Sequence, residues 1–140
     1  MKVLAVDLGV ARTGIAISDA SGLLASPIGT VTMHDRDRLL QQVAALAAEH
    51  GAAEIVVGLP RNMDGSEGES ARHALEFAEK LRAVTGLPVI MRDERLTTVS
   101  AIGFLNETNV RGKKRKSIVD TVSATIILQD YLDSRRGGLK

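Results

Sequence analysis

The sequence predicts a single α/β domain built around a mixed sheet, and two observations carry that prediction. Three apolar segments of strand length come first, separated by short turns, which favours antiparallel hairpins. Longer segments with helical spacing then alternate with short β-branched segments, which is typical of α/β domains. The 140 residues are enough for a sizeable core, and no repeat or long linker divides residues 1–140.

The opening strands are expected at residues 2–7, 13–19 and 24–33. The first is a short apolar run that ends at Asp7. Gly9 and Gly14 mark the turn to the second strand, because glycine adopts backbone angles that other residues avoid. An acidic residue is therefore expected at the open end of a central strand, where a buried carboxylate is costly without a hydrogen bond or a cation.

The remainder of the chain alternates helices and strands. Leucine and alanine recur at helical spacing in segments at residues 36–49, 69–84, 97–106 and 117–134. Short β-branched segments provide the last two expected strands, at 54–60 and 88–94. The connecting segments are expected to be a polar loop at 61–68 and a basic loop at 111–116.

Composition excludes several classes of protein. There is no cysteine, which excludes disulfides and thiolate metal sites and suits a cytoplasmic protein. No apolar segment approaches the roughly 18 residues of a membrane helix, and the opening apolar run is too short for a signal peptide. The 18 basic and 17 acidic side chains nearly balance, so net charge predicts no partner. The three aromatic residues argue against a base-stacking surface for single strands.

Acidic residues follow two of the expected strands. Asp7 ends the first strand, and Asp93 and Glu94 directly follow the apolar run 89–91. Ligands usually bind where strands of an α/β sheet end, so these strands could deliver Asp7 and Glu94 to one edge. Asp93 is expected to be solvated. The alternative for Asp7 is that it caps its own turn by accepting hydrogen bonds from backbone amides.

A third carboxylate, Asp120, lies in the last expected helix. It shares one helical stripe with Ala124, Ile127 and Tyr131, which are expected to pack on the sheet, so Asp120 is expected to point inward. The alternative is a cap formed with Ser117 at the helix start. Three carboxylates without cysteine suit Mg²⁺ or Mn²⁺, which activate water and stabilise the leaving oxygen of a phosphodiester.

Basic residues surround these acids along the chain. The segment RGKKRK at 111–116 directly precedes the helix of Asp120, so its charges would lie beside the metal site and hold a phosphate backbone. The alternative is a solvated surface run. Within this run, Lys113, Lys114, Arg115 and Lys116 are the residues expected to contact nucleic acid.

Four motifs stand in a recognisable order: VDLGVARTGIAISD, VVGLPRNMDGSEG, DERLTT and VDTVSATIILQDYL. Together they resemble the YqgF family, also called RuvX, over about residues 2–133. Members of that family are known as pre-16S rRNA nucleases and as Holliday junction resolvases. The resemblance implies an RNase H-like fold: a five-stranded mixed sheet whose first three strands are antiparallel, with helices on both faces.

The resemblance also implies that Asp7, Glu94 and Asp120 are catalytic and bind divalent metal, with Arg12 and the 61–68 loop around them. Arg12, Arg61, Asn62 and Arg95 are accordingly expected to contact nucleic acid. It implies hydrolysis of phosphodiester bonds in processing the 5′ end of pre-16S ribosomal RNA, with resolution of branched DNA as the alternative. The implied partners are structured RNA or branched DNA and the ribosome or its precursor. One departure is that the family commonly has Lys after the last Asp, where this chain has Thr121.

Two other classes of function are compatible with the sequence. One is a weakly catalytic ribosome-assembly or nucleic-acid-binding factor that keeps the same fold. The other is an actin-like or sugar-kinase phosphotransferase, which also uses an Asp-x-Gly turn after its first strand but needs two such domains around a nucleotide. The sequence is compatible with RNA or DNA as substrate, with an endonuclease or an exonuclease, with one or two metals, and with a monomer or a homodimer.

Overall fold

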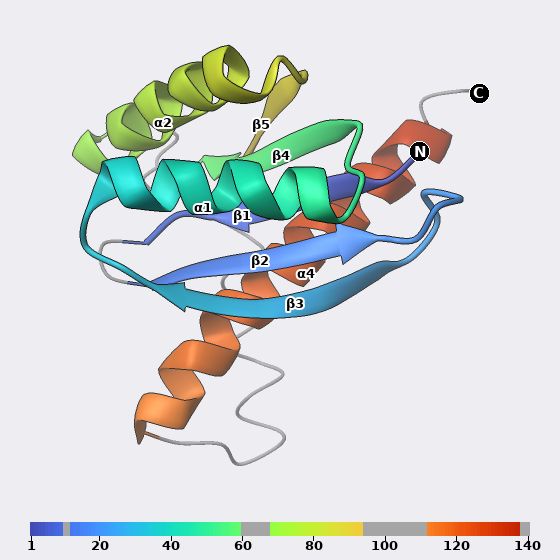
Figure 1. Ribbon diagram of the computed structural model, residues 1–140. Coiled ribbons are helices and arrows are strands. Elements are labelled where there is room, and N and C mark those ends of the chain that lie inside the picture. Colours follow the sequence, from blue (N-terminus) through green and yellow to red (C-terminus); the bar gives the residue numbers. More distant parts are fainter. Residues whose placement is uncertain (10–11, 60–67, 94–111, 138–140) are drawn as a thin grey trace.

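In the computed structural model, the described residues form a five-stranded sheet with helices on both faces (Figure 1). The strand order is β3-β2-β1-β4-β5. The strands are β1 (Val3–Asp7), β2 (Arg12–Ser18), β3 (Ala25–Thr32), β4 (Glu54–Leu59) and β5 (Val89–Asp93). The helices are α1 (Arg36–Glu49), α2 (Glu69–Thr85) and α4 (Gly112–Gly137). The structure describes residues 1–9, 12–59, 68–93 and 112–137, and in α4 it describes side chains from Val122 to Arg135.

The directions of the strands make the sheet mixed. Strand β2 pairs antiparallel with both β1 and β3, whereas β4 pairs parallel with both β1 and β5. The predicted sheet with its first three strands antiparallel is therefore confirmed. Strands β1, β3, β4 and β5 all end on one side of the sheet, which we call the carboxyl edge. Helices α1 and α2 begin on that side (Figure 1).

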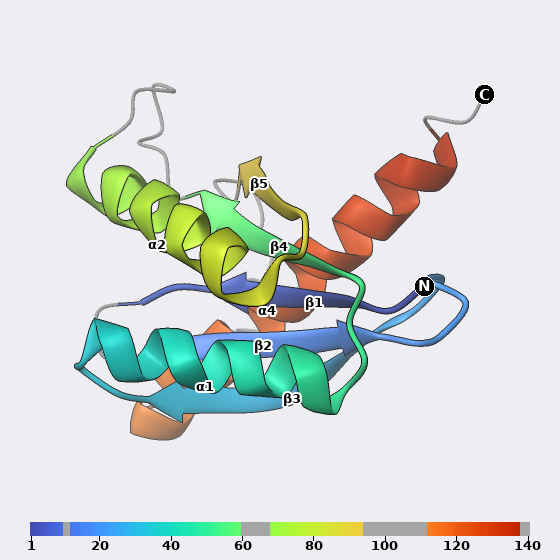
Figure 2. The same cartoon turned by 45° about the horizontal axis from the view of Figure 1, so that its top comes forward.

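Apolar side chains cover both faces of the sheet. Alternation along β1 sends Leu4 and Val6 to one face and Val3 and Ala5 to the other. The first face packs against α1 and α2, which lie side by side over it (Figure 2). The second face packs against α4 alone among the described helices. Removal of this apolar surface from water is the main stabilising contribution to the fold.

The predicted boundaries agree with the structure to within one residue for every described strand and for α1 and α2. The last helix is different, because α4 begins at Gly112 rather than at residue 117. The predicted basic loop is therefore wrong for residues 112–116, which form the first turns of α4. Lysine and arginine are good helix formers, so α4 extends through this run despite its like charges. The helix predicted at 97–106 and the loop predicted at 61–68, except for Gly68, lie outside the described residues.

The earlier start of α4 also removes one alternative for Asp120. Ser117 lies inside the helix rather than at its first residue. A capping residue must have a non-helical backbone at the helix start, so the alternative of a cap at Ser117 is wrong. In the part of the chain that the structure describes, no helix combines the length and apolar character needed to cross a membrane.

Tyr131 supplies a direct test of how α4 packs, because it is the single tyrosine of the chain and there is no tryptophan. Burial, reinforced by a hydrogen bond to Glu54 and by its charge, raises the pKa of Tyr131 from 10.0 to about 12. This protonated tyrosine contributes stability in full below pH 10, and the contribution is lost as the pH rises from 10 towards 12. This rise in the pKa of Tyr131 corresponds to roughly 2–3 kcal/mol of unfolding free energy.

We therefore expect the ultraviolet absorbance of phenolate to appear near pH 12 in the folded protein and near pH 10 in urea. The unfolding free energy should fall over the same interval. In Glu54→Gln the folded transition should move down towards 10, because the neighbouring negative charge is removed. A wild-type transition near pH 10 under native conditions would show that Tyr131 is not packed in this way.

A candidate active site at the carboxyl edge

Asp7 is the last residue of β1 and is half-buried at the carboxyl edge. Alternation with Val3 and Ala5 places it on the face that α4 covers. Its partner in the neighbouring strand β2 is Gly14. Continuing the β1–β4 register by one residue sets it level with Gly58. Neither neighbouring strand therefore presents a side chain beside Asp7 in this row, which leaves space for a ligand or for α4 to approach.

The turn after β1 depends on Gly9. A Cβ atom at this position would lie 2.0 Å from the carbonyl oxygen of Arg12, which is much closer than any allowed contact. Arg12 begins β2, and alternation with Gly14 and Ala16 places it on the α4 face. The turn therefore brings Asp7 and Arg12 to one face and one edge of the sheet.

The second predicted ligand, Glu94, directly follows β5 in the sequence but lies outside the described residues, as do Arg61, Asn62 and Arg95. Strand β5 is separated from β1 by β4 alone, so the two strands are about 10 Å apart. Both end at the carboxyl edge. Asp93 is exposed and alternates with Met91 onto the α1 and α2 face, away from Asp7.

Helix α4 runs in the opposite direction to β1 and β4. Near its end, Tyr131 Oη donates a hydrogen bond of 2.6 Å to Glu54 Oε1, at the first residue of β4. Arg135 forms an ion pair of 3.1 Å with the same oxygen. The eleven residues from Tyr131 back to Asp120 span about 16 Å of helix. The four from Glu54 to Gly58 span about 13 Å of strand. The helix is therefore long enough to bring the backbone of Asp120 to the carboxyl edge.

The helical stripe predicted for α4 packs on the sheet as expected. Ala124, Ile127 and Tyr131 are buried against β1, β2 and β4. Ser123 is also buried, so small residues lie where the helix meets the sheet. Asp120 lies one turn before Ala124 on this stripe. Its side chain, like those of Lys113, Lys114, Arg115 and Lys116, lies outside the described part of α4.

The described side chains by themselves contain no group of three His, Asp or Glu residues able to hold a metal. Two of the three predicted ligands, Glu94 and Asp120, lie outside that set. The chemistry of the predicted donors nevertheless fits a hard divalent cation, because all three are carboxylates, and Asp7 ends β1 while Glu94 directly follows β5 in the sequence. The described neighbours of Asp7 in its row, Gly14 and Gly58, add no competing side chain.

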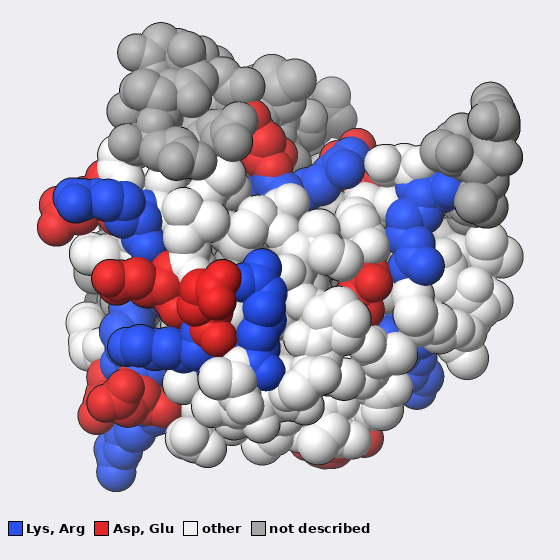
Figure 3. Space-filling view, turned by 90° about the horizontal axis from the view of Figure 1, so that it is seen from above, with Lys and Arg blue, Asp and Glu red and all other residues white. Residues whose placement is uncertain are grey.

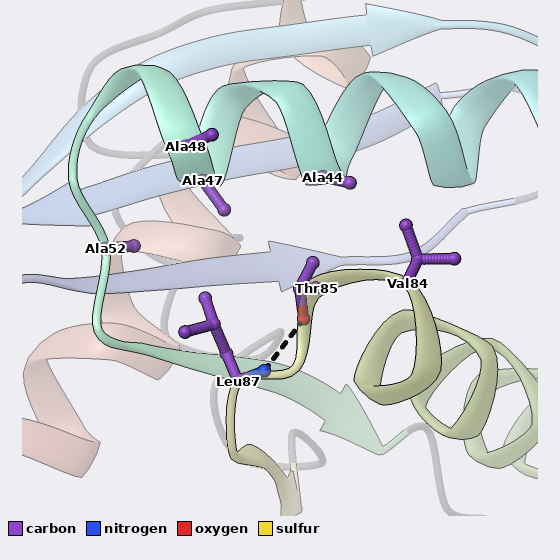
Figure 4. A pocket seen from close by; sticks show the side chains of 7 residues that line it. All are labelled: Ala44, Ala47, Ala48, Ala52, Val84, Thr85 and Leu87. Carbon is purple, nitrogen blue, oxygen red and sulfur yellow. Dashed lines mark hydrogen bonds between the residues drawn. The ribbon is translucent and has the colours of Figure 1, made fainter.

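Two clefts that the sequence did not predict are lined by described residues on the opposite face. One, of about 340 Å³, lies between the ends of α1 and α2, and Figure 4 shows its small apolar lining. Its lining residues are Ala44, Ala47, Ala48, Ala52, Val84, Thr85 and Leu87. The other, of about 210 Å³, has charged walls that include Arg36, Asp37, Glu76 and Lys80. Among the described residues in Figure 3, lysine and arginine side chains lie beside aspartate and glutamate, so the described charges do not form a uniformly basic patch.

Solved structures of resolvases share the fold. Thermus thermophilus RuvC, solved in complex with a Holliday junction substrate, superposes with a TM-score of 0.64 at 14% identity, covering 98% of this chain and 96% of that one. The fowlpox virus Holliday junction resolvase gives a TM-score of 0.60 at 14% identity, covering 96% and 99%. At this identity the likeness concerns the fold alone, and it confirms the predicted RNase H-like architecture.

Sequence comparisons extend the likeness. A protein of Chloroflexus aggregans named "Putative pre-16S rRNA nuclease" is 45% identical over 134 residues, which cover 96% of this chain and 94% of that one. A protein of the same name from Mycobacterium tuberculosis is 45% identical over 133 residues, covering 94% and 78%. The family pattern described as "RuvX: Holliday junction resolvase" matches residues 1–134. The chain therefore belongs to the RuvX family.

Proposed function

We propose that this protein is a nuclease that hydrolyses phosphodiester bonds with the help of Mg²⁺ or Mn²⁺. The observation that carries the proposal is the position of Asp7. It stands at the carboxyl edge, on the α4 face, with glycine on both sides of it in its row. Glu94, next to the end of β5, and Asp120, on the inward stripe of α4, complete the proposed set of ligands. The names of the Chloroflexus and Mycobacterium relatives support a nuclease.

Different residues of the chain would bind the metal and the substrate. The carboxylates of Asp7, Glu94 and Asp120 would hold the cation. When bound, such an ion supplies an activated water and stabilises the departing oxygen. Arg12 shares the face and edge of Asp7, so its guanidinium is suited to balance the charge of a phosphate. The space beside Asp7 over the two glycines admits the substrate backbone.

The basic residues at the start of α4 are proposed to bind the substrate. Lys113, Lys114, Arg115 and Lys116 lie in the first turns of the helix that carries Asp120. Contacts of this kind position a phosphate backbone without reading its sequence. Arg61, Asn62 and Arg95 follow β4 and β5 in the sequence and are proposed as further contacts. The chain would act as one domain in the cytoplasm, as a monomer or a homodimer.

The proposed substrate is precursor 16S ribosomal RNA, cleaved near its 5′ end, because the Chloroflexus and Mycobacterium relatives are named as pre-16S rRNA nucleases. The second candidate is branched DNA, which the description of the family supports. The ribosome or its precursor would be a partner in the first case. A weakly catalytic assembly factor remains the competing hypothesis for the same fold.

Side-by-side cleavage tests this proposal. A labelled precursor RNA fragment and a labelled four-way DNA junction would each be incubated with the protein in Mg²⁺, in Mn²⁺ or in chelator. We expect cutting of the RNA with either cation and no cutting in chelator. Symmetric cutting of the junction alone would favour the resolvase. Cutting that persists in chelator would contradict metal dependence, and no cutting of either substrate would favour the assembly factor.

A further inference from the structure

A basic side chain that the sequence patterns did not single out lies in the same row of the sheet as Asp7. Arg92 pairs with Gly58 in the β4–β5 register, and Gly58 is level with Asp7. Alternation with Ile90, which packs towards α4, places Arg92 on the α4 face. Arg92 and Asp7 therefore extend to one face of the sheet from backbone positions about 10 Å apart, with a glycine between them.

The guanidinium of Arg92 contacts two residues of α4, Asp130 and Ser134. Its Nε donates a hydrogen bond of 2.9 Å to Oδ2 of Asp130, and its Nη2 lies 2.8 Å from the same oxygen in an ion pair. Its Nη1 makes a long contact of 3.4 Å with Ser134 Oγ. Arginine has five N–H donors, so these contacts with described residues leave two N–H groups for a further partner. The side chains of Arg92 and Asp130 are 31% and 55% exposed, which makes the pair weak and accessible.

We propose that Arg92 binds a backbone phosphate of the nucleic acid, and that Asp130 competes with that phosphate for the guanidinium. This inference rests on the proposed function, since the phosphate would belong to the strand that is held at Asp7. The planar guanidinium fork matches phosphate oxygens, and two donors are available for them before the ion pair opens. Asp130 orients the side chain in the free protein and repels the phosphate in the complex.

The test compares two substitutions that a purely structural ion pair would make equivalent. Affinity for a labelled RNA hairpin and for a labelled four-way DNA junction would be measured in chelator over a range of salt. Arg92→Ala should weaken binding about threefold to tenfold and lower the salt slope by about one. Asp130→Asn should strengthen binding about twofold or more. Arg92→Lys should bind with intermediate affinity, because it keeps the charge without the fork.

Asp133 supplies the matched control. It is an exposed carboxylate three residues further along α4, where it accepts a hydrogen bond from Gln129. If Asp130→Asn acted only by removing a negative charge from this helix, Asp133→Asn would strengthen binding equally, and the inference would be wrong. Thermal unfolding of each variant shows whether the fold is retained.

Other outcomes separate the inference from the proposed function. Equal weakening by Arg92→Ala and Asp130→Asn would mean that the pair only holds α4 in place, which overturns the inference. Unchanged binding in Arg92→Ala overturns it as well, while a wild type that binds and cleaves keeps the proposed function. A wild type that neither binds nor cleaves either probe overturns both.

Discussion

Replacing Asp7 by asparagine is expected to abolish cleavage while leaving the fold and the binding of nucleic acid intact. The amide keeps the size and shape of the carboxylate but removes the negative charge that a divalent cation requires. Loss of residues that merely support metal ligands costs about tenfold to a hundredfold, so loss of a ligand should exceed a hundredfold. Initial cleavage rates, thermal unfolding and binding in chelator measure the three properties separately.

Asp93→Asn is the control for this experiment. Asp93 is also a strand-end aspartate at the carboxyl edge, but it is exposed and on the opposite face. We expect the Asp93→Asn protein to cleave like the wild type. If Asp7→Asn retains cleavage, Asp7 is not a metal ligand. If the Asp7→Asn protein does not cleave RNA in vitro but still supports ribosome maturation in cells, the assembly-factor hypothesis is supported.

Gly9→Ala is expected to damage both stability and activity. The added Cβ would overlap the carbonyl oxygen of Arg12, and a backbone atom cannot rotate aside as a side chain can. The turn must therefore shift, and it connects Asp7 directly to Arg12. We expect an unfolding free energy lower by about 1–3 kcal/mol and cleavage reduced by at least about tenfold. Urea unfolding and cleavage rates under saturating substrate check the two effects.

Gly51→Ala separates the local effect from the general cost of substituting a glycine. Gly51 has a φ of +67° and follows α1 at the end remote from Asp7. Among the described residues, nothing beyond its chain neighbours lies within 4 Å of the position that a Cβ would occupy. This variant should lose about 1 kcal/mol of stability through backbone strain and keep full activity. If Gly9→Ala were equally active, the closeness of Gly9 to Arg12 would not matter for the site.

Much of the fold followed from local patterns in the sequence. The strands were predicted to within one residue because β-branched runs end at glycine, proline or acidic residues. The start of α4 was missed by five residues because a run of like charges suggested a loop, whereas the same residues are good helix formers. Arg92 was missed as well, although its alternation with Ile90 was a signal that could have found it.

By itself, the sequence determined the α/β class, the alternation of faces along β1, and the acidic residue at the end of that strand. Only the tertiary structure decided which residues share a row. Gly58 and Arg92 stand beside Asp7 because the register of β1, β4 and β5 puts them there, and register depends on contacts between distant segments. The direction of α4 and its ion pair with Arg92 depend likewise on packing between residues far apart in the chain, which no local period encodes.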